Sequence, residues 1–347
     1  MSIFRQNIAI DLGTATVLVS VEKRGIIIKA PSIVAVKEGT NNILAIGDEA
    51  KKMMGRTPLD IETVKPIKSG VISNYSATEK MLAYFIDKAI RNPLKRVFKP
   101  DVMICIPCKI TGVEKRSVQM AASEAGAGRT FLIEEPLAAA VGAGLEITKP
   151  IGSMVVDIGG GTTDVAVISF EGIVVSRSVK VAGDKYDEAI VSYMRKKYNV
   201  LIGERTAEEL KINVGSVYPG CKGVSEQIRG RDLVSGLPVE LMVTTEELVE
   251  TLMDVTIDIL NCIHSVLEET PPELAADIYT RGIVMTGGGA LLTGLDKLIN
   301  NSTGIDVTIA DEPQYCVVRG TLKALTDMTE AQKASMGKIK TKDENNF

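Results

Sequence analysis

Residues 155–162 of the chain read Val-Val-Asp-Ile-Gly-Gly-Gly-Thr, and residues 8–14 read Ile-Ala-Ile-Asp-Leu-Gly-Thr. Both segments join an apolar run to an aspartate, a glycine turn and a threonine. Each is followed by a second run rich in β-branched residues, Val17–Val21 and Val165–Ile168. This pattern predicts a buried strand, a tight turn and a second strand. Because the pattern occurs twice, the sequence predicts two similar lobes.

The aspartate and glycines of these hairpins suit a nucleoside triphosphate and its magnesium ion. Glycine lets backbone N–H groups approach phosphate oxygens closely, and Mg²⁺ prefers hard oxygen ligands, often through water. Asp11 and Asp157 each stand at the end of a predicted strand, just before the glycines. One glycine run alone would fit any tight hairpin, but two aspartate–glycine–threonine hairpins predict a nucleotide site.

Two further segments extend this predicted site. Residues 283–291, Ile-Val-Met-Thr-Gly-Gly-Gly-Ala-Leu, suit contact with a base or sugar, but equally a plain strand-to-helix turn. Residues 131–136, Phe-Leu-Ile-Glu-Glu-Pro, end a strand on two carboxylates before a proline suited to the first turn of a helix. These acids could complement the helix dipole, or one of them could orient the water that attacks the γ-phosphate.

Composition limits the class of protein. The chain has 347 residues, of which 45% are apolar and 24% charged, as in a globular protein with more than one lobe. A net charge of −4 gives no overall electrostatic case for nucleic-acid binding. No apolar run approaches the roughly 20 residues that span a bilayer. Residues 1–10 show no signal-peptide core, so we expect any membrane contact to be peripheral and the chain to be cytoplasmic.

Cysteine and histidine suggest no separate chemistry. The five cysteines are scattered, and the C-x-x-C pair of Cys105 and Cys108 lacks the second pair of a zinc site. This pair also ends a predicted strand, whereas a thioredoxin-like motif would begin a helix. The single histidine, His264, lies in a helical apolar pattern, and we expect it to be structural.

Several helix starts are marked in the sequence. A hydroxyl residue three positions before a glutamate predicts a capping box, and this spacing occurs at Ser76, Thr111, Thr206 and Thr244. The segment after Thr244 has apolar residues at helical spacing as far as Pro271, which predicts a long amphipathic helix. Helices alternate with strands along the chain, so the sequence predicts an α/β architecture.

Seven segments together resemble the MreB family of bacterial actins. They are residues 11–14, 132–136, 155–163, 178–184, 206–211, 271–278 and 286–292. Four of these segments occur in looser form in actins, sugar kinases and heat-shock chaperone ATPases. The others, and the co-linear match from Ile8 to about Leu325, resemble MreB itself. The resemblance implies an actin-like two-lobed α/β fold, with duplicated ribonuclease-H-like subdomains and a nucleotide cleft between them.

The same resemblance implies the domain boundaries. Residues 1–32, 66–144 and 316–330 would form subdomain IA, and residues 33–65 would form subdomain IB. Residues 145–181 and 244–315 would form subdomain IIA, and residues 182–243 would form subdomain IIB. The chain from Thr329 onward is polar and lysine-bearing, and we expect residues 331–347 to be a disordered tail.

The resemblance also assigns roles by motif position. Asp11 and Asp157 are expected to hold magnesium, mainly through waters. Glu135 is expected to orient the attacking water, with Thr162 as its hydroxyl partner and Glu134 as the second choice. The residues expected to contact ATP or ADP are Gly13, Thr14, Ala15, Thr16, Gly159, Gly160, Gly161 and Thr162 at the phosphates, Glu208, Lys211, Gly287, Gly288, Gly289, Ala290 and Leu291 at the adenosine, and Gly183, Asp184, Glu209 and Leu210 beside them.

The first phosphate loop departs from the family. Relatives usually read Gly-Thr-Ala-Asn-Thr, whereas residues 13–17 read Gly-Thr-Ala-Thr-Val. An amide is replaced by a hydroxyl at Thr16, and a hydroxyl is lost at Val17. Backbone contacts to phosphate do not depend on these side chains, but side-chain contacts do. We therefore expect ATP binding to be retained and hydrolysis to be slow.

The resemblance implies a cytoskeletal function. Such a protein binds and slowly hydrolyses ATP and forms paired filaments at the inner face of the cell membrane. The filaments govern cell shape, or shape and motility in a cell without a wall. The implied partners are further copies of the chain, an anionic membrane surface and membrane-bound shape or wall-synthesis proteins.

A candidate membrane contact lies in residues 91–99. This segment combines four basic residues with Leu94 and Phe98, which suits shallow insertion into an anionic membrane. Alternatively, Val97 and Phe98 begin the next buried strand.

Two other functions fit the same fold. A small-molecule kinase would need a catalytic aspartate base and a substrate pocket, often built by insertions that this compact chain lacks. A chaperone-type ATPase would need a substrate domain after residue 330, where the sequence has only a short polar segment. Polymer formation would separate the filament protein from both alternatives.

Overall fold

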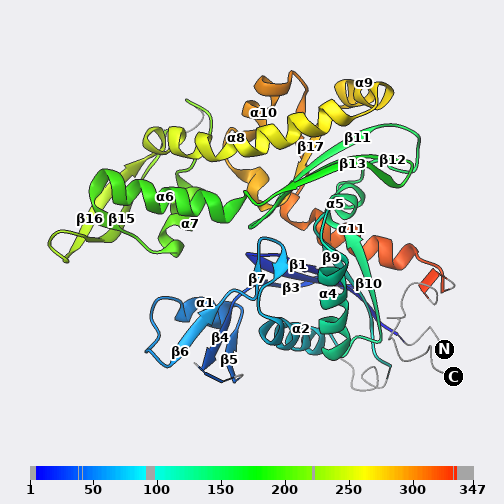
Figure 1. Cartoon of the computed structure of the whole chain (residues 1–347), viewed down its shortest axis with the longest axis horizontal. Coiled ribbons are helices and arrows are strands. Elements are labelled where there is room, and N and C mark those ends of the chain that lie inside the picture. The colour runs from blue at the N-terminus through cyan, green and yellow to red at the C-terminus, as the bar shows by residue number, and fades with distance from the viewer. Residues whose placement is uncertain are drawn as a thin grey trace. The chain divides into compact units, whose positions relative to one another are not determined.

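The computed structural model describes residues 5–37, 39–40, 42–90, 98–220, 223–330 and 332–333. The chain divides into two compact units: unit 1 comprises Met1–Leu145 and Tyr315–Phe347, and unit 2 comprises Glu146–Gln314 (Figure 1). Unit 2 is therefore inserted between the two segments of unit 1. The finer division into four subdomains remains a prediction.

Unit 1 is built on a mixed sheet with the strand order β10-β9-β1-β2-β3. Its strands are β1 (Asn7–Leu12), β2 (Thr16–Val21), β3 (Gly25–Pro31), β9 (Asp101–Ile106) and β10 (Arg129–Glu134). β1 runs antiparallel to β2 but parallel to β9, which is parallel to β10. The carboxyl ends of β1, β9 and β10 therefore reach the same edge of the sheet.

Helices cover both faces of this sheet. On one face, α2 (Tyr75–Ala89) and α4 (Gly112–Glu124) pack on the apolar side chains of β1 that point toward them, such as Ile8 and Ile10. On the other face, α11 (Cys316–Asp327) contacts Ala9 through Val318. The helix α5 (Glu135–Gly142) packs against α11. Asp11 alternates with Ile10 along β1, so it lies on the α11 side.

The rest of unit 1 is a smaller sheet with the order β5-β4-β6, and a short hairpin. These elements are β4 (Val34–Lys37), β5 (Ile43–Ile46), β6 (Ile61–Val64), α1 (Asp48–Met53), β7 (Ile67–Lys68) and β8 (Val71–Ile72). α1 packs on the small sheet through Ala50, against Ile33 and Ala35.

The main sheet of unit 2 repeats the topology of unit 1. Its order is β13-β12-β11-β17-β18, and its strands are β11 (Ser153–Ile158), β12 (Thr163–Ser169), β13 (Gly172–Val179), β17 (Ile283–Thr286) and β18 (Val307–Ile309). β11 is antiparallel to β12 and parallel to β17, as β1 is to β2 and β9. The duplication predicted from the two hairpins is confirmed.

Helices and a second small sheet complete unit 2. The elements are α6 (Gly183–Tyr198), α7 (Glu204–Asn213), α8 (Thr245–Glu269), α9 (Pro272–Arg281), α10 (Leu295–Thr303), η2 (Gly288–Leu291), η3 (Pro313–Tyr315), β14 (Val200–Leu201), β15 (Ser225–Asp232) and β16 (Pro238–Thr244). η3 ends on Tyr315, the first residue of the C-terminal segment of unit 1. A shared apolar core joins α6, α7 and α8 to both sheets. α8 is the long amphipathic helix predicted after Thr244.

Two of the four predicted capping boxes are confirmed and two are wrong. Thr111 and Thr244 form capping boxes at the starts of α4 and α8. α2 begins earlier than predicted, because Oδ1 of Asn74 accepts a hydrogen bond from the N–H of Ala77 at 3.0 Å; asparagine is itself a strong N-cap residue. α7 also begins earlier, at Glu204, so Thr206 lies inside its first turn.

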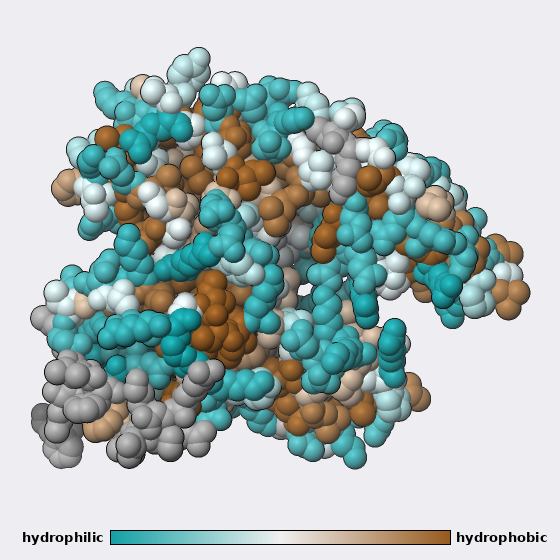
Figure 2. Space-filling view, turned by 180° about the vertical axis from the view of Figure 1, so that it is seen from behind, coloured by the Kyte–Doolittle hydropathy of each residue, from teal (hydrophilic) through white to brown (hydrophobic). Residues whose placement is uncertain are grey.

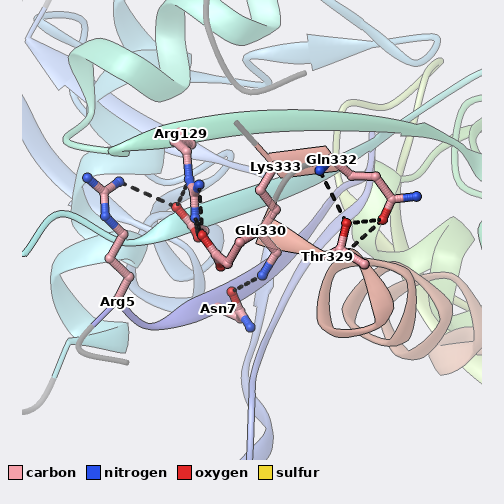
Figure 3. Close-up of polar contacts among 8 residues, drawn as sticks. Arg5, Asn7, Arg129, Thr329, Glu330, Gln332 and Lys333 are labelled. Carbon is pink, nitrogen blue, oxygen red and sulfur yellow. Dashed lines mark hydrogen bonds and ion pairs between the residues drawn. The ribbon is translucent and has the colours of Figure 1, made fainter. Parts of the chain in front are cut away.

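The structure differs from the predicted tail at Gln332 and Lys333, which form a helical turn (Figure 3). Nζ of the buried Lys333 donates to Oδ1 of Asn7 at 3.1 Å. Gln332 accepts from the N–H of Thr329 at 2.8 Å and donates its own N–H to the Thr329 hydroxyl at 3.3 Å. This Thr-x-x-Gln spacing is itself a capping box, which could have predicted the turn. Residues 331 and 334–347 lie outside the described residues.

Candidate functional site

The carboxyl edge of the unit 1 sheet brings together Asp11, Cys105 and Glu135. Asp11 and Cys105 are neighbours because β1 and β9 pair Ile10 with Ile104. Sγ of Cys105 donates to Oδ1 of Asp11 at 3.2 Å. Burial raises the pKa of the Cys105 thiol, and the nearby carboxylates of Asp11 and Glu135 raise it further. The carboxylates of Asp11 and Glu135 thus both raise the pKa of the same thiol.

The carboxyl group of Asp11 lies in a desolvated position. Burial raises its pKa to about 6, and the hydrogen bond from Cys105 only partly offsets this effect. A cation beside a desolvated carboxylate favours the charged form. The position of Asp11 is therefore suited to a nearby cation.

The first phosphate loop is shaped by contacts within unit 1. A Cβ atom on Gly13 would lie 2.6 Å from the carbonyl oxygen of Thr16, so only glycine fits the turn. The buried hydroxyl of Thr14 accepts a hydrogen bond from the N–H of Gly70 at 3.0 Å. Ala15 is exposed and Thr16 half-buried. Val17 is fully buried in the core, so the valine that replaces the family's threonine packs against other apolar side chains. Of the two altered residues, only Thr16 reaches the surface of the loop.

In unit 2, the second phosphate loop is joined to the start of α6. Within the loop, the N–H of Gly159 donates to the carbonyl oxygen of Thr162 at 2.9 Å. The N–H of Gly183 donates to the carbonyl oxygen of Gly159 at 3.2 Å, and that of Asp184 to Gly160 at 2.7 Å. The structure therefore brings together five residues that the sequence placed in two separate segments.

Lys211 connects α7 to the same loop. Its Nζ donates to the carbonyl oxygen of Gly183 at 3.0 Å and to Oδ2 of Asp187 at 2.9 Å. Burial raises the pKa of Asp187 to about 6; Lys211 opposes this shift, whereas Glu208 and Asp184 add to it. Glu208 and Lys211 thus lie in one charged cluster beside the start of α6.

Two predicted contact residues on α7 have their side chains elsewhere. Glu209 forms an exposed ion pair with Arg205 at 2.9 Å, and Leu210 is fully buried in the apolar core. The side chain of Leu210 is therefore enclosed in the core, and that of Glu209 lies at the surface of α7. The helical spacing explains the difference, because residues 208 and 211 share a face that residues 209 and 210 do not.

The third glycine run packs against the end of β11. A Cβ atom on Gly287 would lie 2.3 Å from the carbonyl oxygen of Ile158, and one on Gly289 would lie 2.3 Å from Cγ2 of the same residue. Close packing therefore explains both glycines. A Cβ atom on Gly288 would meet no described atom within 4 Å, so packing does not require this glycine. Ala290 is buried and Leu291 is largely exposed.

Asp157 lies at the carboxyl edge of the unit 2 sheet, opposite Thr286 on β17. The hydroxyl of Thr286 donates to Oδ1 of Asp157 at 2.6 Å, and both residues are buried. Sequence reasoning did not identify this partner of Asp157, nor the role of Cys105 beside Asp11. Thr286 ends β17 and Cys105 is the last residue but one of β9, but only the strand pairing shows which aspartate each one meets.

The implied magnesium ion fits these carboxylates in chemical terms. The described part of the chain contains no cluster of three or more His, Cys, Asp or Glu residues that could hold a metal by itself. Asp11 and Asp157 each supply hard carboxylate oxygens beside a glycine hairpin. Mg²⁺ commonly binds through one or two carboxylates, with phosphate and water oxygens as the other ligands. Each aspartate therefore supplies, within its own unit, the type of oxygen ligand that magnesium prefers.

The two main sheets correspond strand by strand, and each has an aspartate–glycine hairpin at its carboxyl edge. This duplicated arrangement defines the actin-like fold class. Residues 5–333 match the family model described as "MreB/Mbl protein". The chain therefore belongs to the MreB/Mbl family, whose curated relatives are named as cell shape-determining proteins.

Individual relatives match over nearly their whole length. The cell shape-determining protein Mbl of Bacillus cereus is 50% identical over 319 residues, which cover 92% of this chain and 95% of Mbl. MreB of Escherichia coli is 47% identical over 326 residues, or 93% and 94% of the two chains.

Two solved structures of MreB5 of Spiroplasma citri share the fold. The structure bound to AMPPNP has a TM-score of 0.86 and 40% identity, and the match covers 91% of this chain and 95% of that one. The structure bound to ADP has a TM-score of 0.87 and 38% identity, with coverages of 93% and 99%.

Proposed function

We propose that this chain binds ATP with magnesium, hydrolyses it slowly and assembles into cytoskeletal filaments. The observation that carries the nucleotide proposal is the pair of glycine hairpins, each beside an aspartate at the carboxyl edge of its sheet. The AMPPNP and ADP bound to Spiroplasma citri MreB5 support it, because AMPPNP is an analogue of ATP.

Each unit by itself has residues proposed to contact the nucleotide. In unit 2, the loop of residues 159–162 and the N–H groups at the start of α6 bind phosphate oxygens, since helix N-termini and glycine loops favour anions. Glu208, Lys211 and residues 287–291 contact the adenosine. In unit 1, residues 13–16 bind phosphate.

Asp11 in unit 1 and Asp157 in unit 2 are the residues that would hold magnesium, mainly through waters. Magnesium, when bound, neutralises charge on the phosphates. Glu135 accepts a hydrogen bond from the attacking water, and Thr162 assists it. The resulting reaction is the hydrolysis of ATP to ADP and phosphate.

The small-molecule kinase is not supported. The relatives reported above are named for cell shape, and none is named as a kinase.

Assembly is the first testable consequence. Adding ATP and magnesium to the purified protein should move it from the soluble fraction to the pellet on high-speed centrifugation, and electron microscopy should show filaments. Asp157→Ala should remain largely soluble, because losing a magnesium-organising charge weakens nucleotide binding. Parent protein that stays monomeric across a range of salt and magnesium concentrations would refute the filament proposal, although the fold would stand.

We further propose that the filaments lie at the cytoplasmic face of an anionic membrane. None of the described helices combines the length and apolar character needed to cross a bilayer. Phe98 is 38% exposed. Leu94, the other residue of the predicted membrane contact, lies outside the described residues. Membrane-bound shape or wall-synthesis proteins are the further partners that this location suggests.

Replacing Leu94 and Phe98 by serine should reduce co-sedimentation with anionic vesicles, and high salt should weaken binding of the parent protein. Apolar residues gather at the tip of the β15–β16 hairpin, at the right of Figure 2. Val234→Ser, in the turn between these strands, is a matched control, since Val234 is 86% exposed. It should bind vesicles as the parent does. Equal bound fractions for parent and double variant would move the membrane contact to another segment.

A further inference from the structure

The two proposed magnesium-binding aspartates are held in the same way in the two units. Asp11 accepts a hydrogen bond from Cys105, on the next parallel strand, at 3.2 Å. Asp157 accepts one from Thr286, also on the next parallel strand, at 2.6 Å. β9 and β17 hold equivalent positions in the two sheets, so Cys105 and Thr286 are structural counterparts.

Each hydrogen bond restrains a carboxylate through a buried donor. Cys105 is 3% exposed and Thr286 is fully buried, so bulk water does not compete with either donor. In both pairs the acceptor is Oδ1. A donor at Oδ1 fixes the rotation of the carboxylate and hence the direction of its other oxygen. Hydrogen-bond partners of this kind orient metal ligands in many proteins.

We propose that Cys105 and Thr286 are a matched pair of positioning residues, each of which orients the aspartate of its own unit, Asp11 or Asp157, for binding magnesium. This inference rests on the proposed nucleotide function. It adds two residues that touch neither nucleotide nor metal and that act only through the carboxylates.

The two donors differ in strength. A hydroxyl is a good hydrogen-bond donor, whereas a thiol is a weak one. Thr286 should therefore hold Asp157 more firmly than Cys105 holds Asp11. Removing the hydroxyl should have the larger effect, and replacing the thiol by a hydroxyl should strengthen the restraint on Asp11.

Titrations of ATP at several magnesium concentrations and in EDTA test this inference. Thr286→Val removes the donor at nearly constant volume, and should raise the magnesium concentration needed for half-maximal tightening of ATP binding about 10–100-fold. Affinity in EDTA should stay at the parent value. Cys105→Ala should give a smaller shift, about 3–10-fold. Thr286→Ser and Cys105→Ser retain a donor and should restore the magnesium response.

Another buried threonine provides the control. The hydroxyl of Thr321 on α11 donates to the carbonyl oxygen of Val317 in its own helix at 2.7 Å. Thr321→Val should leave the magnesium response unchanged, and melting curves should show that all variants are folded.

Three results would overturn the inference. The first is a parent-like magnesium response in Thr286→Val and Cys105→Ala. The second is an equal loss of ATP affinity with magnesium and in EDTA in these variants, which would indicate a merely structural role. A third is failure of the serine variants to restore the response. If the parent protein itself binds no ATP, the proposed function fails together with this inference.

Discussion

Glu135→Ala should slow phosphate release about 10²–10⁴-fold, the usual cost of losing one positioned acid–base group, and leave ATP affinity nearly unchanged. Glu135 begins α5 directly after β10, and its carboxylate is near the thiol that bonds Asp11. This position suits contact with water beside the phosphates rather than with the nucleotide itself. The loss corresponds to about 3–5 kcal/mol of transition-state stabilisation.

The adjacent glutamate provides the matched control. Glu134 ends β10 and lies 3.6 Å from Nζ of Lys115 on α4, so its carboxylate is engaged on another element. Glu134→Ala should hydrolyse ATP at close to the parent rate. A slow Glu134 variant beside an unaffected Glu135 variant would show that the assignment is displaced by one residue. If both variants match the parent, neither residue orients the water.

Gly320→Ala should lower the free energy of unfolding by about 3–5 kcal/mol, more than the usual 1–3 kcal/mol for overpacking. A Cβ atom on Gly320 of α11 would lie 1.8 Å from the carbonyl oxygen of Ala138 on α5. A Cβ atom on Gly142 of α5 would likewise lie 1.8 Å from the carbonyl oxygen of Cys316. The backbones of α5 and α11 are thus in direct contact at these glycines. Because the clashing atoms belong to the backbone, no change of side-chain rotamer can relieve the clash.

Thermal and urea unfolding followed by circular dichroism measures this loss. Gly112→Ala is the control, because a Cβ atom there meets no described atom within 4 Å at the first position of α4. It should be neutral or slightly stabilising, since alanine favours the helix over glycine by about 0.5–1 kcal/mol. Parent-like melting of Gly320→Ala would mean that α5 and α11 are not packed as described.

The duplicated sheet could be predicted because its signal is local. Each hairpin joins two apolar runs through an aspartate and glycines within about 14 residues, and periodicity reads such a unit directly. Partners from distant segments were not predictable in this way. Thr286 meets Asp157 across 129 residues, and Lys333 meets Asn7 across 326. These contacts depend on which strands and helices become neighbours, and no local pattern encodes that choice.

The contact set on α7 shows a second limit. A motif match names consecutive residues, here Glu208 to Lys211, although a helix turns consecutive side chains in different directions. In the structure, Lys211 donates a hydrogen bond to the carbonyl oxygen of Gly183, whereas Leu210 is buried in the core. The motif was therefore identified correctly, but the sequence match did not show which of its side chains face the core of the unit.

The insertion of unit 2 has a consequence for synthesis on the ribosome. Unit 2 is continuous in sequence and can fold as soon as it is made, whereas unit 1 needs α11 from the far end of the chain. The roughly 170 intervening residues take about 10–30 s to translate. During this time, Ala9, Leu18, Met103 and Phe131 lack the helix that buries them. We expect nascent unit 1 to be the segment that chaperones must protect from aggregation.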